Sequence, residues 1–113
     1  MDSEDRQFLL TTAWMFARHG QRERARALCE ALVEDQPRDG VSAAALAELL
    51  LADREAARAL EVVRGAQFPP ELARAEALLE TRALAALGRK EESQRRWRRY
   101  VQASKGAGRS WVN

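Results

Sequence analysis

The segment that decides the fold is residues 13–37, AWMFARHGQRERARALCEALVEDQP. A glycine at position 20 separates two helix-forming stretches, and Pro37 follows the second stretch. Ala13 lies seven residues before this glycine, and Ala25 lies five residues after it. Small side chains at these positions let two antiparallel helices approach closely, glycine permits a tight turn, and proline ends the second helix. The segment therefore predicts a helical hairpin.

The spacing recurs near the end of the chain. Gly88 lies two periods of 34 residues after the first glycine, with Thr81 seven residues before it and Ser93 five residues after it. A period of about 34 residues is typical of tetratricopeptide repeats. An ordinary six-helix bundle with chance spacing is the alternative interpretation.

A middle repeat is expected between these two hairpins. Taking Ala52 as its turn places Ala45 seven residues before, Ala57 five residues after and Pro69 seventeen residues after. This alignment requires a slip of about two residues relative to the period of 34. It predicts that Ala45 contacts Ala57 across the middle hairpin.

Composition agrees with a helical chain. The 113 residues include 22 alanines and 14 leucines but no isoleucine, and this length suits one domain. We expect an all-α fold of three tetratricopeptide-like hairpins, about six helices, forming a short right-handed solenoid with a concave groove. The predicted repeats cover residues 4–37, 41–69 and 70–104. A flexible tail, 105–113, would follow and would contain Trp111.

Several polar residues are well placed to cap these helices. Ser3, Ser42 and Asp53 each precede a helix-forming stretch and are predicted N-caps. Pro70 suits the first position of the fifth helix. The predicted last helix runs from about Lys90 to Ala103.

The first hairpin resembles the start of the YscY (SctY) chaperones of bacterial type III secretion. The residues that carry the resemblance are Gln7, Phe8, Leu9, Leu10, Trp14, Gly20 to Ala25, Leu32, Val33 and Pro37. Near the C-terminus, the spacing from Gly88 to Trp97, Arg98, Arg99, Tyr100 and Val101 also matches. The resemblance covers most of the chain except the middle third, Val41 to Pro70.

The resemblance implies a small cytoplasmic chaperone of the secretion apparatus. Members of this family bind a secreted apparatus protein, SctX (YscX), and through it engage the export gate protein SctV. The expected assembly is a heterodimer with the client. Related three-repeat proteins chaperone needle subunits or translocators, and a generic tetratricopeptide adaptor is a further alternative.

The first helix of each tetratricopeptide hairpin lines the concave groove. Helix one carries a core stripe, predicted to comprise Phe8, Leu9, Ala13 and Phe16, and a second apolar stripe that needs another partner. The predicted partner-binding residues in the groove are Leu10, Trp14, Ala17, Leu46, Leu49, Leu50, Leu78, Leu79 and Arg82. An apolar groove suits an amphipathic helix or extended apolar peptide. For each residue, packing in the core or exposure to solvent is the alternative.

Charge is distributed unevenly. Residues 1–88 carry a net charge of −4, and residues 89–113 carry +6. The basic end includes Arg95, Arg96, Arg98 and Arg99. The aromatic residues between these arginines, Trp97 and Tyr100, share one helical face with Ser93 and Ser104. We therefore expect the two aromatics to point at the core rather than to stack on bases. The arginines are then the solvated side of a terminal helix, with an acidic protein surface or, less favoured, nucleic acid as alternative partners.

Residues that carry catalytic chemistry are few. Cys29 lies on the apolar stripe of the second helix and is expected to be a small buried hydrophobe. His19 lies at a helix C-terminus, where the dipole favours its charged form. No phosphate-binding loop or nucleophile–base pattern occurs, so we expect no enzyme activity, no cofactor and no metal. The chain contains no apolar run of membrane-spanning length and no basic leader.

Overall fold

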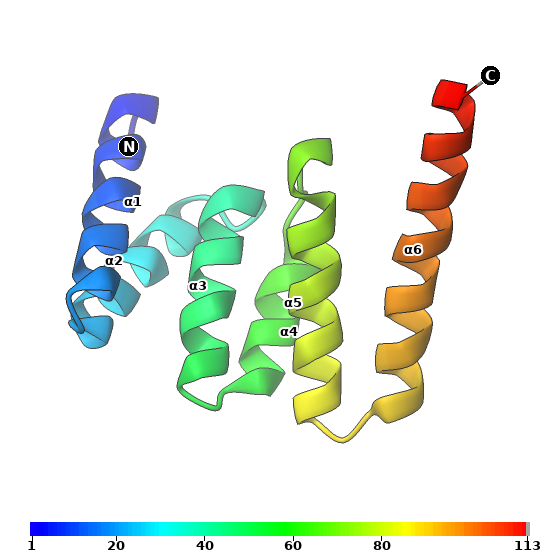
Figure 1. Cartoon of the computed structure of the whole chain (residues 1–113). Helices are drawn as coiled ribbons and strands as arrows, with labels where there is room; N and C mark the ends of the chain where they lie inside the picture. The colour runs from blue at the N-terminus through cyan, green and yellow to red at the C-terminus, as the bar shows by residue number, and fades with distance from the viewer. Residues whose placement is uncertain (113) are drawn as a thin grey trace.

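The computed structural model describes the backbone of residues 1–112 and the side chains of residues 1–106. The chain is all-helical and forms three consecutive helical hairpins, which follow one another in a row (Figure 1). The helices are α1 (Ser3–Arg18), α2 (Arg22–Asp35), α3 (Gly40–Ala52), α4 (Ala56–Gly65), α5 (Ala73–Ala86) and α6 (Lys90–Val112). A single 3₁₀ turn, η1 (Pro70–Leu72), leads into α5. The predicted fold class is confirmed.

Each hairpin turns through one residue with left-handed backbone geometry. These residues are Gly20, Arg54 and Gly88, with φ angles of +77°, +63° and +77°. The backbone N–H of the following residue donates to a carbonyl five residues back, at 2.8, 2.8 and 2.9 Å respectively. The turns are therefore 34 residues apart, and the period runs through the middle hairpin without a slip.

The small residues that pack inside the hairpins follow this period. Ala13 and Ala25 of the first hairpin are buried, as are Ala47 and Ala59 of the second. The prediction that Ala45 contacts Ala57 is wrong, because Ala57 is exposed and the true turn lies two residues after Ala52. Because an arginine, Arg54, adopts the left-handed conformation at this turn, the sequence contains no glycine that would indicate the position of the turn.

The third hairpin keeps the same contact with polar side chains. The hydroxyl of Ser93 donates a hydrogen bond of 2.9 Å to the backbone carbonyl of Thr81. The Thr81 hydroxyl oxygen is itself buried without a hydrogen-bond partner among the described residues. Thr81 and Ser93 occupy the positions that Ala13 and Ala25 occupy in the first hairpin. The helices of the third hairpin therefore approach at the same positions, with polar side chains in place of alanines.

Helix boundaries differ from the predicted caps at three places. Asp2, rather than Ser3, caps α1 by accepting a 2.8 Å bond from the backbone N–H of Asp5. Asp39, rather than Ser42, caps α3. Asp53 ends α3 instead of beginning α4. In the first two cases an aspartate, one residue before Ser3 and three residues before Ser42, supplies a carboxylate that complements the helix dipole more strongly than a serine hydroxyl.

The last helix is longer than predicted. It continues from Lys90 to Val112 rather than ending near Ala103. Isolated glycines within a helix weaken it by roughly 1 kcal/mol each but do not block it, and no proline interrupts this stretch. The side chain of Trp111 lies outside the described residues. No helix in the described part of the chain is both long and apolar enough to cross a bilayer.

The connections between hairpins are held by a close backbone approach. Asp39 and Gln67 form an isolated parallel bridge, in which the Gln67 N–H donates to the Arg38 carbonyl at 2.9 Å. A Cβ on Gly40 would lie 2.7 Å from the Gln67 carbonyl oxygen and 2.8 Å from the Phe68 Cα. Glycine is therefore required at the start of α3, because any side chain would push the two connections apart.

The left-handed turn of the middle hairpin yields a testable prediction. Arg54→Gly should raise the free energy of unfolding by about 1 kcal/mol, because glycine adopts positive φ without steric cost. Gly20→Ala should lower it by a similar amount. Urea unfolding followed by circular dichroism measures both effects. The control, Gly65→Ala, has open space and no positive φ, so a loss there as large as at Gly20 would contradict the explanation.

Candidate functional site

The candidate binding surface lies on the first helices of the three hairpins. Arg82 on α5 donates from Nη1 to both carboxylate oxygens of Glu48 on α3, at 3.0 and 3.1 Å. These residues are 34 positions apart, and Trp14 lies 34 positions before Glu48. The ion pair therefore shows that equivalent positions on successive first helices face the same side of the molecule.

The period extends this row one turn in each direction. We define the first-helix face as the three equivalent rows around the ion pair. Its members are Leu10, Ala44 and Leu78; Trp14, Glu48 and Arg82; and Ala17, Leu51 and Ala85. Seven of the nine are apolar, and none belongs to the fully buried core.

Trp14 is the largest exposed apolar side chain on this face. It is 59% exposed, and the Arg18 guanidinium lies 4.8 Å from its ring centroid. The cation–π contact orients the indole without covering it. Leu10, one turn earlier, is half-buried and lines a hollow of about 300 Å³ with Gln7 and Val41, where α1 meets α3.

Five of the nine predicted groove residues lie on the first-helix face. They are Leu10, Trp14, Ala17, Leu78 and Arg82. The prediction used the correct period of 34 in the first and third hairpins, so these positions are in register. Whether they bind a partner remains a prediction.

Three of the predicted groove leucines belong to the core instead. Leu46 and Leu50 are 0% exposed, and Leu79 is 2% exposed. Leu46 and Leu50 were aligned through the wrong middle turn. In the correct register Glu48 takes the place of Leu46, and Ala44 and Leu51 join it on this face. All three could have been found from their spacing of 34 to Leu10, Trp14 and Ala17.

Two other predictions for the first helices also change. Leu49 is half-buried and packs on the core, beside a hollow of about 990 Å³ at the hairpin turns that Ala17 also lines. Phe8, predicted as core, is 69% exposed. Its equivalent in the second hairpin, Ser42, is buried, and Arg6 of the preceding hairpin donates to its hydroxyl at 3.2 Å.

The corrected register predicts different costs for two leucines. Leu50→Ala should lower the free energy of unfolding by about 3 kcal/mol, because it leaves a cavity in the core. Leu78→Ala, on the half-buried face, should cost about 1 kcal/mol. Urea unfolding at neutral pH compares the two variants. Equal losses would contradict the assignment of Leu50 to the core and Leu78 to the surface.

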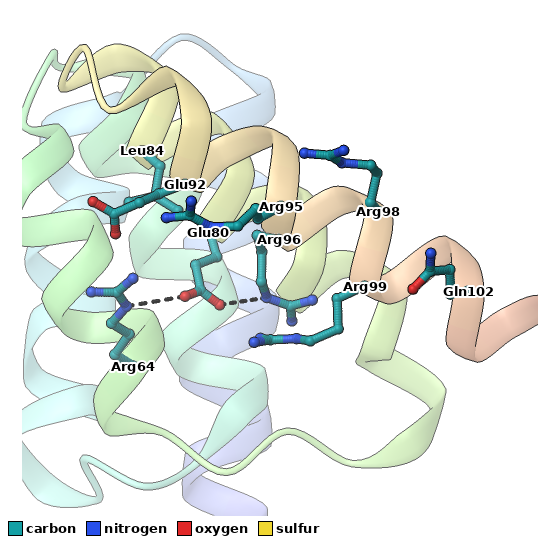
Figure 2. Close-up of a pocket in the computed structure, with 9 residues that line it drawn as sticks. All are labelled: Arg64, Glu80, Leu84, Glu92, Arg95, Arg96, Arg98, Arg99 and Gln102. Atoms are coloured by element: carbon teal, nitrogen blue, oxygen red, sulfur yellow. Dashed lines mark hydrogen bonds and ion pairs between the residues drawn. The ribbon is translucent and has the colours of Figure 1, made fainter.

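A second concave region lies on the other side of the third hairpin. We call it the basic hollow; it has a volume of about 580 Å³ and lies between α4, α5 and α6 (Figure 2). It is lined by Arg64, Glu80, Leu84, Glu92, Arg95, Arg96, Arg98, Arg99 and Gln102. Sequence reasoning identified the arginines of α6 but missed Arg64 and Glu80, because nothing in their local sequence indicates that they meet.

Glu80 organises this hollow. It accepts bonds from the Nε of Arg96 at 2.7 Å and from the Nε of Arg64 at 3.0 Å. The Glu80 and Arg96 side chains are only 13% and 12% exposed. Burial opposes ionisation of Glu80, but the bonds from the two arginines prevail and hold its pKa below the ordinary value.

The lowered pKa of Glu80 predicts acid sensitivity. A carboxylate whose pKa falls on folding stabilises the protein above its unfolded pKa, and this contribution disappears as pH falls through the folded value. Glu80→Gln should therefore be less stable than wild type at pH 7, and the difference should shrink below about pH 4.5. Unfolding by urea at pH 7, 5 and 3 measures it. A difference that stays constant over this range would contradict the ion-pair role.

The cysteine and histidine occupy structural positions. Cys29 is 1% exposed, as predicted, and burial together with the nearby Glu30 charge raises the pKa of its thiol to about 11. His19 is the C-cap residue of α1. Among the residues whose side chains are described, no three His, Cys, Asp or Glu side chains are grouped so as to hold a metal ion.

The aromatics of α6 form a local pair. The rings of Trp97 and Tyr100 are 5.3 Å apart between centroids and tilted by 33°. Both side chains are half-buried. Trp97 lines a hollow of about 460 Å³ with Thr81 and Ser93, which shares only Arg98 with the basic hollow.

Comparison with known proteins finds no relative of this chain among protein families or curated proteins.

Proposed function

We propose that this protein is a tetratricopeptide-like binding protein that holds an apolar helical segment of a client against its first-helix face. The observation that carries the proposal is the exposed Trp14, which lies between the apolar residues Leu10 and Ala17 on the first-helix face of α1. A bare tryptophan side chain is stabilised when a partner covers it, and tryptophan is enriched among residues that dominate binding energy.

The shape and charge of the face support a helical or extended apolar ligand. Leu10, Ala44 and Leu78 form one apolar row, and Leu51 continues the surface towards the hairpin turns. The Glu48–Arg82 pair lies in the middle and is about half-exposed. Each of these groups retains capacity to bond a polar group or a backbone amide of the client, which would set its register.

The resemblance to the SctY chaperones narrows the proposal. The client would be a small secreted apparatus protein like SctX, held as a heterodimer in the bacterial cytoplasm and delivered to the export gate protein SctV. The protein would act by covering client surface that otherwise self-associates, and no step requires catalysis or a cofactor. Trp14, Gly20, Gly88 and Trp97 are among the residues that support the resemblance.

Substitution at the first-helix face tests the proposal. The tagged chain is expressed in its native host, and captured proteins are identified by mass spectrometry. Trp14→Ala should reduce recovery of the client about tenfold, because the variant loses the largest apolar contact. The matched control is Met15→Ala, which removes a side chain that is 52% exposed and lies about 100° around the same helix.

The outcomes distinguish the parts of the proposal. Loss with Trp14→Ala but not with Met15→Ala supports the first-helix face as the binding surface. Unchanged recovery with Trp14→Ala, in a variant that keeps its helical circular dichroism, contradicts that surface. Recovery of a needle subunit, a translocator or a protein unrelated to secretion would instead reject the SctX-like client.

A further inference from the structure

Two guanidinium groups of the basic hollow are held in place by Glu80 but use only one of their N–H donors to bind it. Arg64 and Arg96 each bind Glu80 through Nε alone. Their terminal Nη groups make no hydrogen bond or ion pair within the part of the chain that the structure describes. An arginine carries five N–H donors, so each of these two side chains keeps four for another acceptor. One carboxylate thus holds two binding groups side by side.

The neighbouring charges leave the hollow strongly positive. Arg95 and Arg99 of α6 form no ion pair with any described residue, and Figure 2 shows both beside the Glu80 pair. Glu92 accepts two bonds from Arg89, the residue just before α6, at 2.7 and 2.8 Å. Glu80 therefore faces four arginines with a single negative charge.

We propose that the basic hollow binds an acidic segment of a protein partner. Carboxylates of successive Asp or Glu residues would accept bonds from the Nη groups of Arg64 and Arg96, flanked by Arg95 and Arg99. Planar guanidinium groups suit carboxylates because they donate two parallel bonds at once. A volume of about 580 Å³ is large enough for several side chains of such a segment.

The surroundings favour an acidic peptide over a nucleic acid. The aromatic pair of α6 is half-buried, and Trp97 lines an adjacent hollow that shares Arg98 with the basic hollow but none of the four arginines of the proposed site. Those four arginines therefore have no described base-stacking platform among them. Residues 1–88 carry a net charge of −4, which repels a long phosphate backbone beyond the hollow. A short acidic segment would be attracted to the basic arginines of α6 and would not extend far enough to meet this repulsion.

This site is separate from the first-helix face. Glu80 and Arg82 are two residues apart on α5, which places them about 200° apart around the helix. A client on the first-helix face and an acidic segment in the basic hollow would therefore bind opposite sides of the third hairpin. The inference stands whether or not the protein is a secretion chaperone.

A labelled peptide tests the site directly. The probe is a fluorescein-labelled octaglutamate peptide titrated with the full chain, and fluorescence anisotropy is followed at 25 and 300 mM NaCl. Wild type should bind saturably and more weakly at high salt. The double variant Arg95→Gln/Arg99→Gln should bind at least about fivefold more weakly. The matched control, Arg24→Gln/Arg38→Gln, removes the same charge from exposed arginines outside the hollow.

The Glu80→Gln variant separates positioning from general attraction. It makes the hollow more positive, so attraction by net charge alone predicts tighter binding. If Glu80 positions the two guanidinium groups, binding should instead weaken by about threefold or more, in a chain whose thermal melt confirms folding. Tighter binding by this variant, or an equal loss in the Arg24/Arg38 control, would overturn the proposal. An octathymidylate that binds more tightly than octaglutamate would also overturn it, in favour of nucleic acid.

Discussion

The structure depends on the geometry of three hairpin turns. Gly20, Arg54 and Gly88 adopt left-handed conformations, and each turn is closed by a backbone bond to a carbonyl five residues earlier. This geometry reverses the chain within three residues and forces the two helices of a hairpin into antiparallel contact. The close approach then requires small residues near the turn, so glycine, alanine and serine positions follow from one constraint.

The equal spacing of the turns makes equivalent residues face the same direction. Side chains 34 positions apart therefore meet between hairpins, as Glu48 and Arg82 do. Ion pairs between hairpins recur elsewhere: Arg26 binds Asp53 and Glu55 at the next turn, and Arg58 binds Glu30 on the second helices. Exposed pairs of this kind contribute about 0–1 kcal/mol each, so they set the register of the hairpins more than their stability.

The charge asymmetry of the chain acquires a structural basis. Most of the positive charge in residues 89–113 belongs to residues of α6, and one of them, Arg96, meets Arg64 of α4 at Glu80. Arg22, Arg26 and Arg58 are paired between hairpins. Arg95, Arg98 and Arg99 make no ion pair with the described residues, and all three line the basic hollow. The basic end is therefore more than a solvated cap, because its arginines gather around a concave region that one carboxylate organises.

The sequence by itself determined the helical class, the two outer hairpins and five residues of the first-helix face. Glycine at a turn and small residues at fixed distances are local signals, so Gly20 and Gly88 could be recognised without any tertiary contact. The caps differ from the predicted serines because an aspartate one residue before Ser3, and another three residues before Ser42, accepts from the backbone N–H at the helix start. The register of the middle hairpin was missed because Arg54 adopts a conformation that its residue type does not indicate.

Only the tertiary structure decided which leucines are buried and which charges meet. Leu46 and Leu50 resemble their surface neighbours in an apolar helix, and burial depends on the helices packed around them. Glu80 likewise binds one arginine 16 positions before it and another 16 positions after it, Arg64 and Arg96, each on a different helix. Helix propensity and local spacing act within a few turns, whereas cores and charge clusters form between segments that only folding brings together.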